Sequence, residues 1–340
     1  MKSSLFVLSG EDYTFPSAEI RALGETYSPQ LFECENLSPR VIRSNMEDPM
    51  LISKITRRAA YCRFGGVLLG AGETVGELAH EIGRDLFETG KAFVVDSVTL
   101  DRLQCAELGA LIKEKTGAKV SLENPGLVFQ LERVPEGFVL ALSADGFKTS
   151  TWRLRRPRAR KFFLPSAIFP KLACLLVNLS RVKEEEYFLD PFCGTGSLLI
   201  ESSLMGINTV GFDLTRWIAR GAQQNLNQFS LDRGSVCRVD STQPRLPVRF
   251  VDAIGTDVPY GRASSTKGKE TRIIMKEFTY AAAEILDASP RKKPKYCVVM
   301  RPSEIEFEFD KSYFDLHEEH LLYVHRHLTR AISVLRRRSN

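Results

Sequence analysis

The pattern of the second half of this 340-residue chain constrains its fold more than any other feature. From residue 187 onward, short apolar runs alternate with longer segments of helical spacing, which is typical of a parallel sheet with helices on both faces. The predicted strands are 187–189, 209–212, 236–239, 251–255 and 296–300, and the predicted helices are 196–205, 216–229 and 270–286. We therefore expect a doubly wound α/β domain, closed by an antiparallel appendix made of segments 307–309, 321–324 and 332–335.

The first half lacks this alternation and mixes short strands with helices. The predicted strands are 5–8, 93–98, 120–122, 128–134 and 138–143. The predicted helices are 75–89, 101–115 and one that begins at 17–23, and segment 45–58 leads into another. The sequence therefore predicts an α+β region in two subparts.

Charge also separates the two halves, although the net charge of +5 conceals it. Residues 1–147 carry 15 Lys and Arg against 21 Asp and Glu, whereas residues 148–340 carry 32 against 21. A strongly basic half favours a polyanionic partner, so nucleic acid, nucleotide and anionic membrane are the first candidates. No stretch approaches the roughly 20 apolar residues of a membrane-spanning helix, and the N-terminus does not resemble a secretory signal. We expect a soluble, cytoplasmic protein.

Neither the cysteines nor the histidines predict a metal site. The seven cysteines are scattered without a C-x-x-C pair, which fits neither a disulfide framework nor a zinc cluster. Three of the five histidines, at positions 317, 320 and 325, lack the H-x-x-x-H spacing of a helical metal site. A metal-dependent hydrolase is therefore a poor interpretation.

A basic segment joins the two halves, with nine Lys or Arg and no acid between Lys148 and Val182. Its densest part, residues 153–161, is flanked by Trp152 and Phe162. A solvated linker is one interpretation, and contact with phosphates by cations beside aromatic rings is the other. The candidate RNA-contacting residues here are Arg153, Arg155, Arg156, Arg158, Arg160 and Lys161.

A glycine-rich turn, residues 190–196, lies where the first strand of the α/β domain passes into a helix. Glycines there let the backbone approach a ligand, and the helix N-terminus offers free N–H groups. A dehydrogenase turn would have a third glycine near Leu199. Asp190 at the start of the turn would repel a pyrophosphate but would hold an ammonium group, so a cofactor that contains an amino acid fits better than a dinucleotide.

Two further acids follow the next two predicted strands. Asp213 comes about 20 residues after the glycine turn, where it can accept hydrogen bonds from ribose hydroxyls. Asp240 follows the third strand. Each acid alone is typical of a helix N-cap, but three at successive strand ends indicate one crevice at that edge of the sheet.

The fourth strand ends in Asp257-Val258-Pro259-Tyr260-Gly261. These residue types are common in ordinary turns. At the carboxyl end of a buried strand they also supply a carboxylate acceptor, a stiffened backbone and an aromatic face. Those are the parts needed to hold a planar base and its exocyclic amino group.

These two segments carry a family resemblance. D-P-F-C-G-T-G followed by D-V-P-Y-G resembles the D-P-x-C-G-[ST]-G and [DN]-P-P-[YF] motifs of S-adenosylmethionine-dependent amino-methyltransferases. Over nearly its full length, the chain resembles the archaeal and eukaryotic tRNA guanosine-10 N2-methyltransferases, and segments 121–128, 163–173 and 323–330 are similar to further parts of that family. The resemblance implies a ferredoxin-like piece plus a THUMP RNA-binding domain in residues 1–147. A basic linker at 148–165 and a Rossmann-like class I methyltransferase domain at 166–340 would follow, with a C-terminal antiparallel strand pair.

The resemblance also implies a role for individual residues. The cofactor S-adenosylmethionine would be bound by Pro165, Asp190, Cys193, Gly194, Thr195, Gly196, Asp213 and Asp240. Within that set, Asp213 would hold the ribose and Asp240 the adenine amino group. Asp257 and the carbonyl of Val258, which stands where the wider pattern has proline, would accept from the guanine N2 amino group. Pro259 would hold Val258 extended and Tyr260 would stack on the base. Apart from the resemblance, the basic excess near the C-terminus adds Arg326 and Arg330 to the candidate RNA-contacting residues.

Two kinds of partner follow from the resemblance: a tRNA whose target base leaves its stem, and a small zinc-binding activator subunit. The activator would add to the edge strand at 235–239, and the chain would otherwise be a monomer. The alternatives are a THUMP methyltransferase for another tRNA position or for ribosomal RNA, and a non-catalytic RNA-binding protein with a methyltransferase fold. Adenine N6 methylation of DNA would leave the N-terminal half unexplained.

Overall fold

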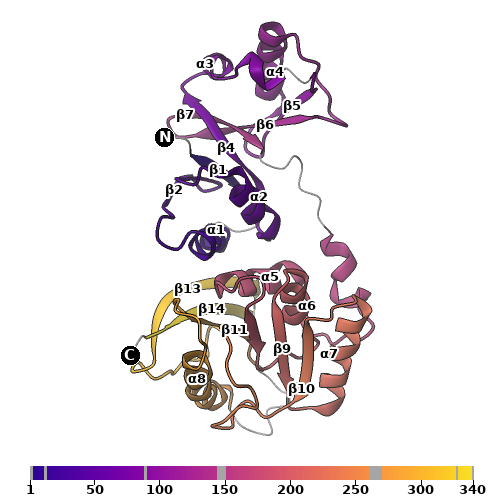
Figure 1. The fold of residues 1–340 in the computed structure, drawn as a ribbon, viewed down its shortest axis with the longest axis vertical. Helices are drawn as coiled ribbons and strands as arrows, with labels where there is room; N and C mark the ends of the chain where they lie inside the picture. Colours follow the sequence, from indigo (N-terminus) through magenta and orange to yellow (C-terminus); the bar gives the residue numbers. More distant parts are fainter. Residues whose placement is uncertain are drawn as a thin grey trace. The chain divides into compact units, whose positions relative to one another are not determined.

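The computed structural model describes residues 3–10, 14–87, 90–143, 151–259, 270–326 and 328–338. The chain divides into two compact units, Met1–Ser150 and Thr151–Asn340 (Figure 1). Each unit is built on its own seven-stranded sheet. Within the described ranges, no helix is long and apolar enough to cross a membrane.

The N-terminal unit is an α+β structure, as predicted. Its elements are β1 (Ser4–Leu8), α1 (Thr14–Tyr27), β2 (Cys34–Ser38), β3 (Val41–Ser44), α2 (Pro49–Arg58), β4 (Cys62–Gly72), α3 (Val75–His80), β5 (Phe93–Asp96), α4 (Arg102–Thr116), β6 (Leu127–Val134) and β7 (Gly137–Ser143). The strands lie in the order β2-β3-β1-β4-β7-β6-β5, and only β5 and β6 of the neighbouring pairs run parallel. The two expected subparts therefore share one sheet.

The two subparts have separate hydrophobic cores. Helices α1 and α2 cover the part around β1, where Phe6, Ile20 and Ile55 are fully buried (Figure 1). Helices α3 and α4 cover the part around β6, where Leu108 and Phe129 are fully buried. Strand β4 pairs with β1 on one side and with β7 on the other, so it joins the two parts.

Sequence reasoning missed β4, because Gly65 and Gly66 are poor strand formers. The structure shows why glycine stands at both positions. A Cβ atom at residue 65 would lie 1.9 Å from Thr56 Oγ1, and one at residue 66 would lie 2.2 Å from the Leu142 carbonyl oxygen. The close approach of α2 and β7 therefore requires both glycines. The helix predicted at 75–89 also differs, because α3 ends at His80 and a separate 3-10 turn, Arg84–Phe87, follows.

The C-terminal unit has the predicted doubly wound topology. Its elements are α5 (Pro170–Leu179), β8 (Tyr187–Asp190), α6 (Ser197–Leu204), β9 (Asn208–Asp213), α7 (Arg216–Gln228), β10 (Gly234–Arg238), β11 (Ala253–Asp257), α8 (Thr271–Asp287), β12 (Tyr296–Pro302), β13 (Phe314–His325) and β14 (Leu328–Arg337). The strand order is β10-β9-β8-β11-β12-β14-β13, with β10 at one edge. Strands β8 to β12 are parallel, and β14 and β13 are antiparallel to their neighbours. The expected C-terminal strand pair is confirmed.

Two local differences concern the ends of this sheet. The expected strand at 307–309 is irregular, and Phe307 and Phe309 instead pack as partly buried rings against the core of β11, β12 and α8. The strand expected at 321–324 is much longer, since β13 begins at Phe314. Its outer face carries polar side chains in an edge position, which hides its length from an apolar pattern.

Candidate active site

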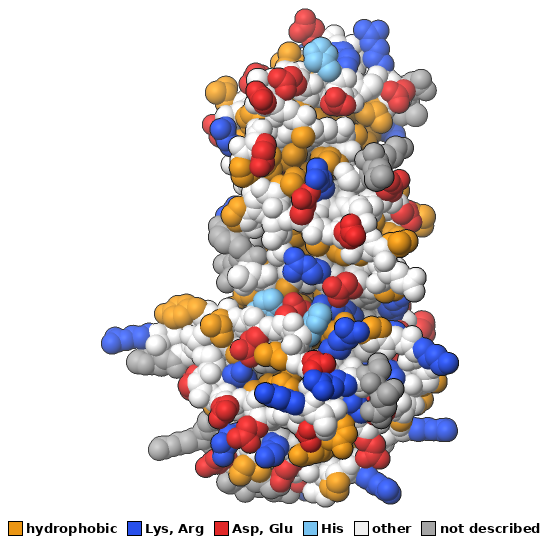
Figure 2. Space-filling view, turned by 90° about the vertical axis from the view of Figure 1, so that its left-hand side faces the viewer, with side chains coloured by type: hydrophobic (Ala, Val, Ile, Leu, Met, Phe, Trp, Pro, Cys, Tyr) orange, Lys and Arg blue, Asp and Glu red, His pale blue; other side chains and the backbone are white. Residues whose placement is uncertain are grey.

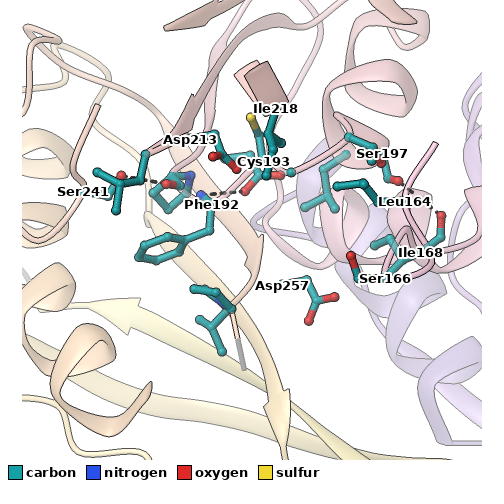
Figure 3. Close-up of a pocket in the computed structure, with 18 of the residues that line it drawn as sticks. Leu164, Ser166, Ile168, Phe192, Cys193, Ser197, Asp213, Ile218, Ser241 and Asp257 are labelled. Atoms are coloured by element: carbon teal, nitrogen blue, oxygen red, sulfur yellow. Dashed lines mark hydrogen bonds between the residues drawn. The ribbon is translucent and has the colours of Figure 1, made fainter. Parts of the chain in front are cut away.

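A pocket of about 360 Å³ opens at the carboxyl ends of β8, β9 and β11 (Figure 3). Ligands bind at this edge of open α/β sheets, and the volume suits a small molecule. Phe192 and Ser241 lie on one side of the open space, and Leu164, Ser166 and Ile168 lie on the other. All lining residues belong to the C-terminal unit.

Asp190 ends β8 beneath the pocket and is almost fully buried. Its Oδ1 atom accepts hydrogen bonds from Thr256 Oγ1 at 2.7 Å and from the backbone N–H of Phe192 at 3.2 Å. Burial raises the pKa of Asp190 to about 7, and the bonds from Thr256 and Phe192 oppose that rise. A nearby positive charge would therefore keep this carboxyl ionised. Sequence reasoning missed Thr256, although a polar residue in an apolar strand was the signal that could have marked it.

The glycine turn depends on two left-handed residues. Gly194 has φ +51° and Gly196 has φ +81°, and both values favour glycine. Gly196 caps the N-terminus of α6, but Cys193, Gly194 and Thr195 line the pocket and Gly196 does not. Burial, reinforced by the charges of nearby acids, raises the pKa of the Cys193 thiol. A thiol with a raised pKa is a poor nucleophile, because the thiolate is the reactive form.

The other two predicted acids line the same pocket. Asp213 ends β9, and its Oδ1 atom accepts a hydrogen bond from the backbone N–H of Thr215 at 2.7 Å. Burial raises the pKa of Asp213 to about 6. Asp240 follows β10, and its Oδ1 atom accepts from Thr242 Oγ1 at 2.6 Å. The three acids therefore meet at one edge of the sheet, as their positions after successive strands predict.

Asp257 ends β11 and points into the open middle of the pocket (Figure 3). Its Oδ2 atom accepts a hydrogen bond from Arg330 Nη1 at 3.0 Å, whereas its Oδ1 atom is buried and has no hydrogen-bond partner among the described residues. Burial raises the pKa of Asp257 to about 6, and Arg330 opposes the rise. Val258 and Pro259 line the pocket beside it. Tyr260 lies outside the described residues.

The charge of the pocket favours a cationic ligand. Asp190, Asp213 and Asp257 all have raised pKa values, chiefly because burial disfavours their ionised forms, and the charges of Asp257 and Asp213 add to the rise at Asp190. Arg330 is the only Lys or Arg among the described lining residues, and it is engaged with Asp257. These carboxylate acceptors thus fit a group with a positive centre and hydroxyls, such as a sulfonium nucleoside that carries an amino acid.

The basic segment divides into inward and outward side chains. Arg155 donates to both carboxylate oxygens of Glu201 on α6, at 2.9 and 3.0 Å, and Arg160 donates to Ser197 Oγ at 2.7 Å. The outward set is exposed and comprises Arg153, Arg156, Arg158 and Lys161. On the face shown in Figure 2, Lys and Arg side chains are spread over the lower unit with acidic side chains between them.

Three other predicted residues lie in different surroundings from one another. Arg326 is exposed at the turn between β13 and β14. Arg330, for which the basic C-terminal segment predicts an RNA contact, is 8% exposed and lies inside the pocket. Pro165 is exposed and does not line the pocket, although its neighbours Leu164 and Ser166 do.

Known proteins resemble this chain both in the pocket-bearing unit and over nearly its full length. Residues 157–331 match the UPF0020 family, described as RMKL-like, methyltransferase domain. The chain is 33% identical to the tRNA (guanine(10)-N2)-dimethyltransferase of Methanothermobacter thermautotrophicus, over 98% of this chain and 99% of that protein. It is 28% identical to the enzyme of the same name from Methanocaldococcus jannaschii, also over 98% of this chain and 99% of that one.

Among solved structures, the fold is similar to that of TrmN from Thermus thermophilus, with a TM-score of 0.54 at 15% identity over 98% of this chain and 99% of that one. A likeness at this identity concerns the fold only. The full-length relatives, together with the match over the pocket-bearing unit, settle the affiliation: the chain belongs to the tRNA (guanine(10)-N2)-dimethyltransferase family.

Proposed function

We propose that this protein transfers methyl groups from S-adenosylmethionine to the N2 atom of guanosine 10 in tRNA. The observation that carries the proposal is the Asp257 carboxylate in a pocket lined with acids: Arg330 holds one of its oxygens, and the other is buried with no hydrogen-bond partner among the described residues. The names of the full-length relatives support position 10 and a second transfer to the same nitrogen.

The acids of the pocket would hold the cofactor. Asp190 would face its ammonium group across the glycine turn, Asp213 would accept from the ribose hydroxyls, and Asp240 would accept from the adenine amino group. The raised pKa values of Asp190 and Asp213 support this assignment, because a cationic ligand relieves the cost of ionising them. When bound, the cofactor supplies an electrophilic methyl group on its sulfonium.

The residues after β11 would position the guanine. Its N2 lone pair is delocalised into the ring, so orientation of N2 toward the methyl group matters more than full deprotonation. Asp257 Oδ1 and the Val258 carbonyl would accept the two N2 hydrogens and stabilise the positive charge that develops on nitrogen. The Val258 N–H donates to the Met300 carbonyl at 3.0 Å, and Thr271 Oγ1 donates to the Pro259 carbonyl at 3.0 Å. These bonds fix the segment to β12 and α8, and Tyr260 would stack on the base.

The contacts with tRNA would come from both units. Residues 1–147 would form the RNA-binding region, residues 148–165 a linker, and residues 166–340 the methyltransferase domain. The exposed side chains of the linker and of the β13–β14 turn would neutralise phosphates, and the target base would leave its stem to reach Asp257. We place this activity in the cytoplasm.

A small zinc-binding activator subunit would add to the edge strand β10. Val236, Cys237 and Arg238 are accessible there, and β10 pairs with β9 alone among the described strands. An edge strand of this kind can accept another strand. Apart from this partner, the chain would act as a monomer.

The test is methyl transfer by the purified chain to two tRNA transcripts that differ only in having guanosine or adenosine at position 10. We expect incorporation into the first and none into the second. Asp257→Ala should abolish transfer while the cofactor dissociation constant stays nearly unchanged. Equal incorporation into both transcripts would contradict the position, and an active Asp257→Ala variant would contradict the assigned site.

A further inference from the structure

We infer that Arg330 is a positioning residue: it holds Oδ2 of Asp257 from β14 and so directs Oδ1 at the amino group of the target base. The inference deepens the proposed function and rests on it. It also gives Arg330 a role different from the phosphate contact that its basic neighbourhood predicts.

The first support is the geometry of the three strands that meet here. Asp257 is paired with Met300 in the parallel register of β11 and β12, and Arg330 is paired with Pro302 in the antiparallel register of β12 and β14. Both backbones are therefore fixed by sheet hydrogen bonds. The Arg330 side chain crosses the end of β12, where Nη1 lies 3.0 Å from Asp257 Oδ2 and 3.7 Å from Met300 Sδ.

The second support is the asymmetry of the Asp257 carboxylate. Arg330 bonds to only one of its oxygens, and the other is buried, with no hydrogen-bond partner among the described residues. Leaving a buried acceptor unpaired is costly, so such atoms call for a ligand or an explanation. A single bond to Oδ2 fixes the carboxylate rotation and presents Oδ1 to a donor. A primary amine on a planar base is such a donor.

The third support is the ionisation of Asp257, which can be followed through the pH dependence of methyl transfer. Asp257 accepts from an amine only as a carboxylate. Among the described residues, Arg330 on β14 favours ionisation of Asp257. The charge of Asp257 in turn raises the pKa of Asp190 at the end of β8 by like-charge repulsion. Burial raises the pKa of Asp257 to about 6 even with Arg330 in place. Removing the guanidinium moves that pKa further up, so activity should then be lost at a higher pH.

The experiment measures single-turnover methyl transfer to the guanosine-10 transcript from pH 5.5 to 9, with S-adenosylmethionine binding measured in parallel. We compare the full chain with Arg330→Gln, Arg330→Lys and the control Arg336→Gln, which removes an exposed charge from the same strand. For Arg330→Gln we expect about 100-fold slower transfer at pH 7.5, since misplacement of a catalytic group by about 1 Å has that effect. The cofactor dissociation constant should change by less than about threefold.

The pH profile separates positioning from a purely structural role. In the parent and in Arg336→Gln, activity should fall as the pH drops through about 6, whereas in Arg330→Gln this limb should move up by one unit or more, with partial recovery at pH 9. Arg330→Lys keeps the charge but loses the guanidinium geometry, so its limb should stay in place while its rate falls.

Several outcomes would overturn the inference. An acidic limb of the pH–rate profile that stays in place in Arg330→Gln contradicts the inference. A higher KM for tRNA with an unchanged rate at saturation also contradicts it, because that result would make Arg330 an RNA contact. If Arg330→Gln no longer binds the cofactor, the test is the single-turnover rate of Arg330→Lys. A rate equal to that of the parent chain overturns the inference. If the parent chain itself does not methylate the transcript, the proposed function fails first, so the two failures are distinguishable.

Discussion

Replacing Arg155 by alanine should destabilise the C-terminal unit far more than its place in a basic surface segment suggests. The Arg155 and Glu201 side chains are 14% and 3% exposed, and two hydrogen bonds join them. Removing one partner of a buried ion pair costs about 3–5 kcal/mol, because the other charge stays buried. Arg160 also acts on Glu201, so we expect the lower end, about 3 kcal/mol. For a unit of this size that lowers Tm by about 6–12 °C.

Scanning calorimetry of the full chain measures this effect in the transition that S-adenosylmethionine shifts upward. Arg153→Ala, which removes an exposed cation two residues away, is the matched control and should stay within about 0.5 kcal/mol of the parent. Adding Glu201→Gln to Arg155→Ala should recover much of the loss. Burial raises the pKa of Glu201 in the folded state, so the Arg155→Ala variant should regain stability as the pH falls. A Tm within about 1 °C of the Arg153→Ala value would refute the reasoning.

Three further predictions concern ligands. Asp190→Asn should weaken S-adenosylmethionine binding at least about tenfold by titration calorimetry. The affinity of the parent chain should fall as the pH drops below about 7, because the pKa of the Asp190 carboxyl is raised to about 7. An affinity that does not depend on pH would contradict this contact. Neutralising Arg153, Arg156 and Arg158 together should make the plot of log affinity for tRNA against log salt concentration less steep, by about 0.7–0.9 for each phosphate that the segment neutralises. An unchanged slope would show that the segment does not contact the tRNA phosphates. Asn225→Ala should raise the cofactor dissociation constant and speed proteolysis near Phe162. The Asn225 amide is hydrogen-bonded to the backbone of Phe162 and to the Thr195 carbonyl, at 2.8 to 2.9 Å, so its loss frees both segments. An unchanged dissociation constant and an unchanged proteolysis rate would contradict this prediction.

Much of the C-terminal unit could be predicted, because buried parallel strands are apolar throughout and the helices between them have a regular period. The cluster of Asp190, Asp213 and Asp240 followed from topology, since parallel strands bring their carboxyl ends to one edge. The N-terminal unit was harder. Its longest strand, β4, depends on glycines that fit only because helix α2 and strand β7 lie against them.

Charged residues were the least predictable part of the site. A run of arginines in the sequence cannot reveal that Glu201 on α6 needs Arg155 as a partner. Similarly, Arg330 meets Asp257 from 73 positions away, through pairings across three strands. Local pattern indicates where charge is dense, whereas the fold decides which of those charges are paired inside the protein.

Strand β4 has a consequence for how such proteins can be recombined. It pairs with β1 through Cys62 to Val67 and with β7 through Gly66 to Gly72, so the two pairings overlap within a single strand. Dividing the N-terminal unit at β4 would leave each fragment with a strand edge whose backbone groups are unpaired and with an incomplete hydrophobic core, which favours aggregation. The N-terminal piece and its neighbour are therefore not interchangeable cassettes, and a chimaera between family members has to inherit the whole sheet from one parent.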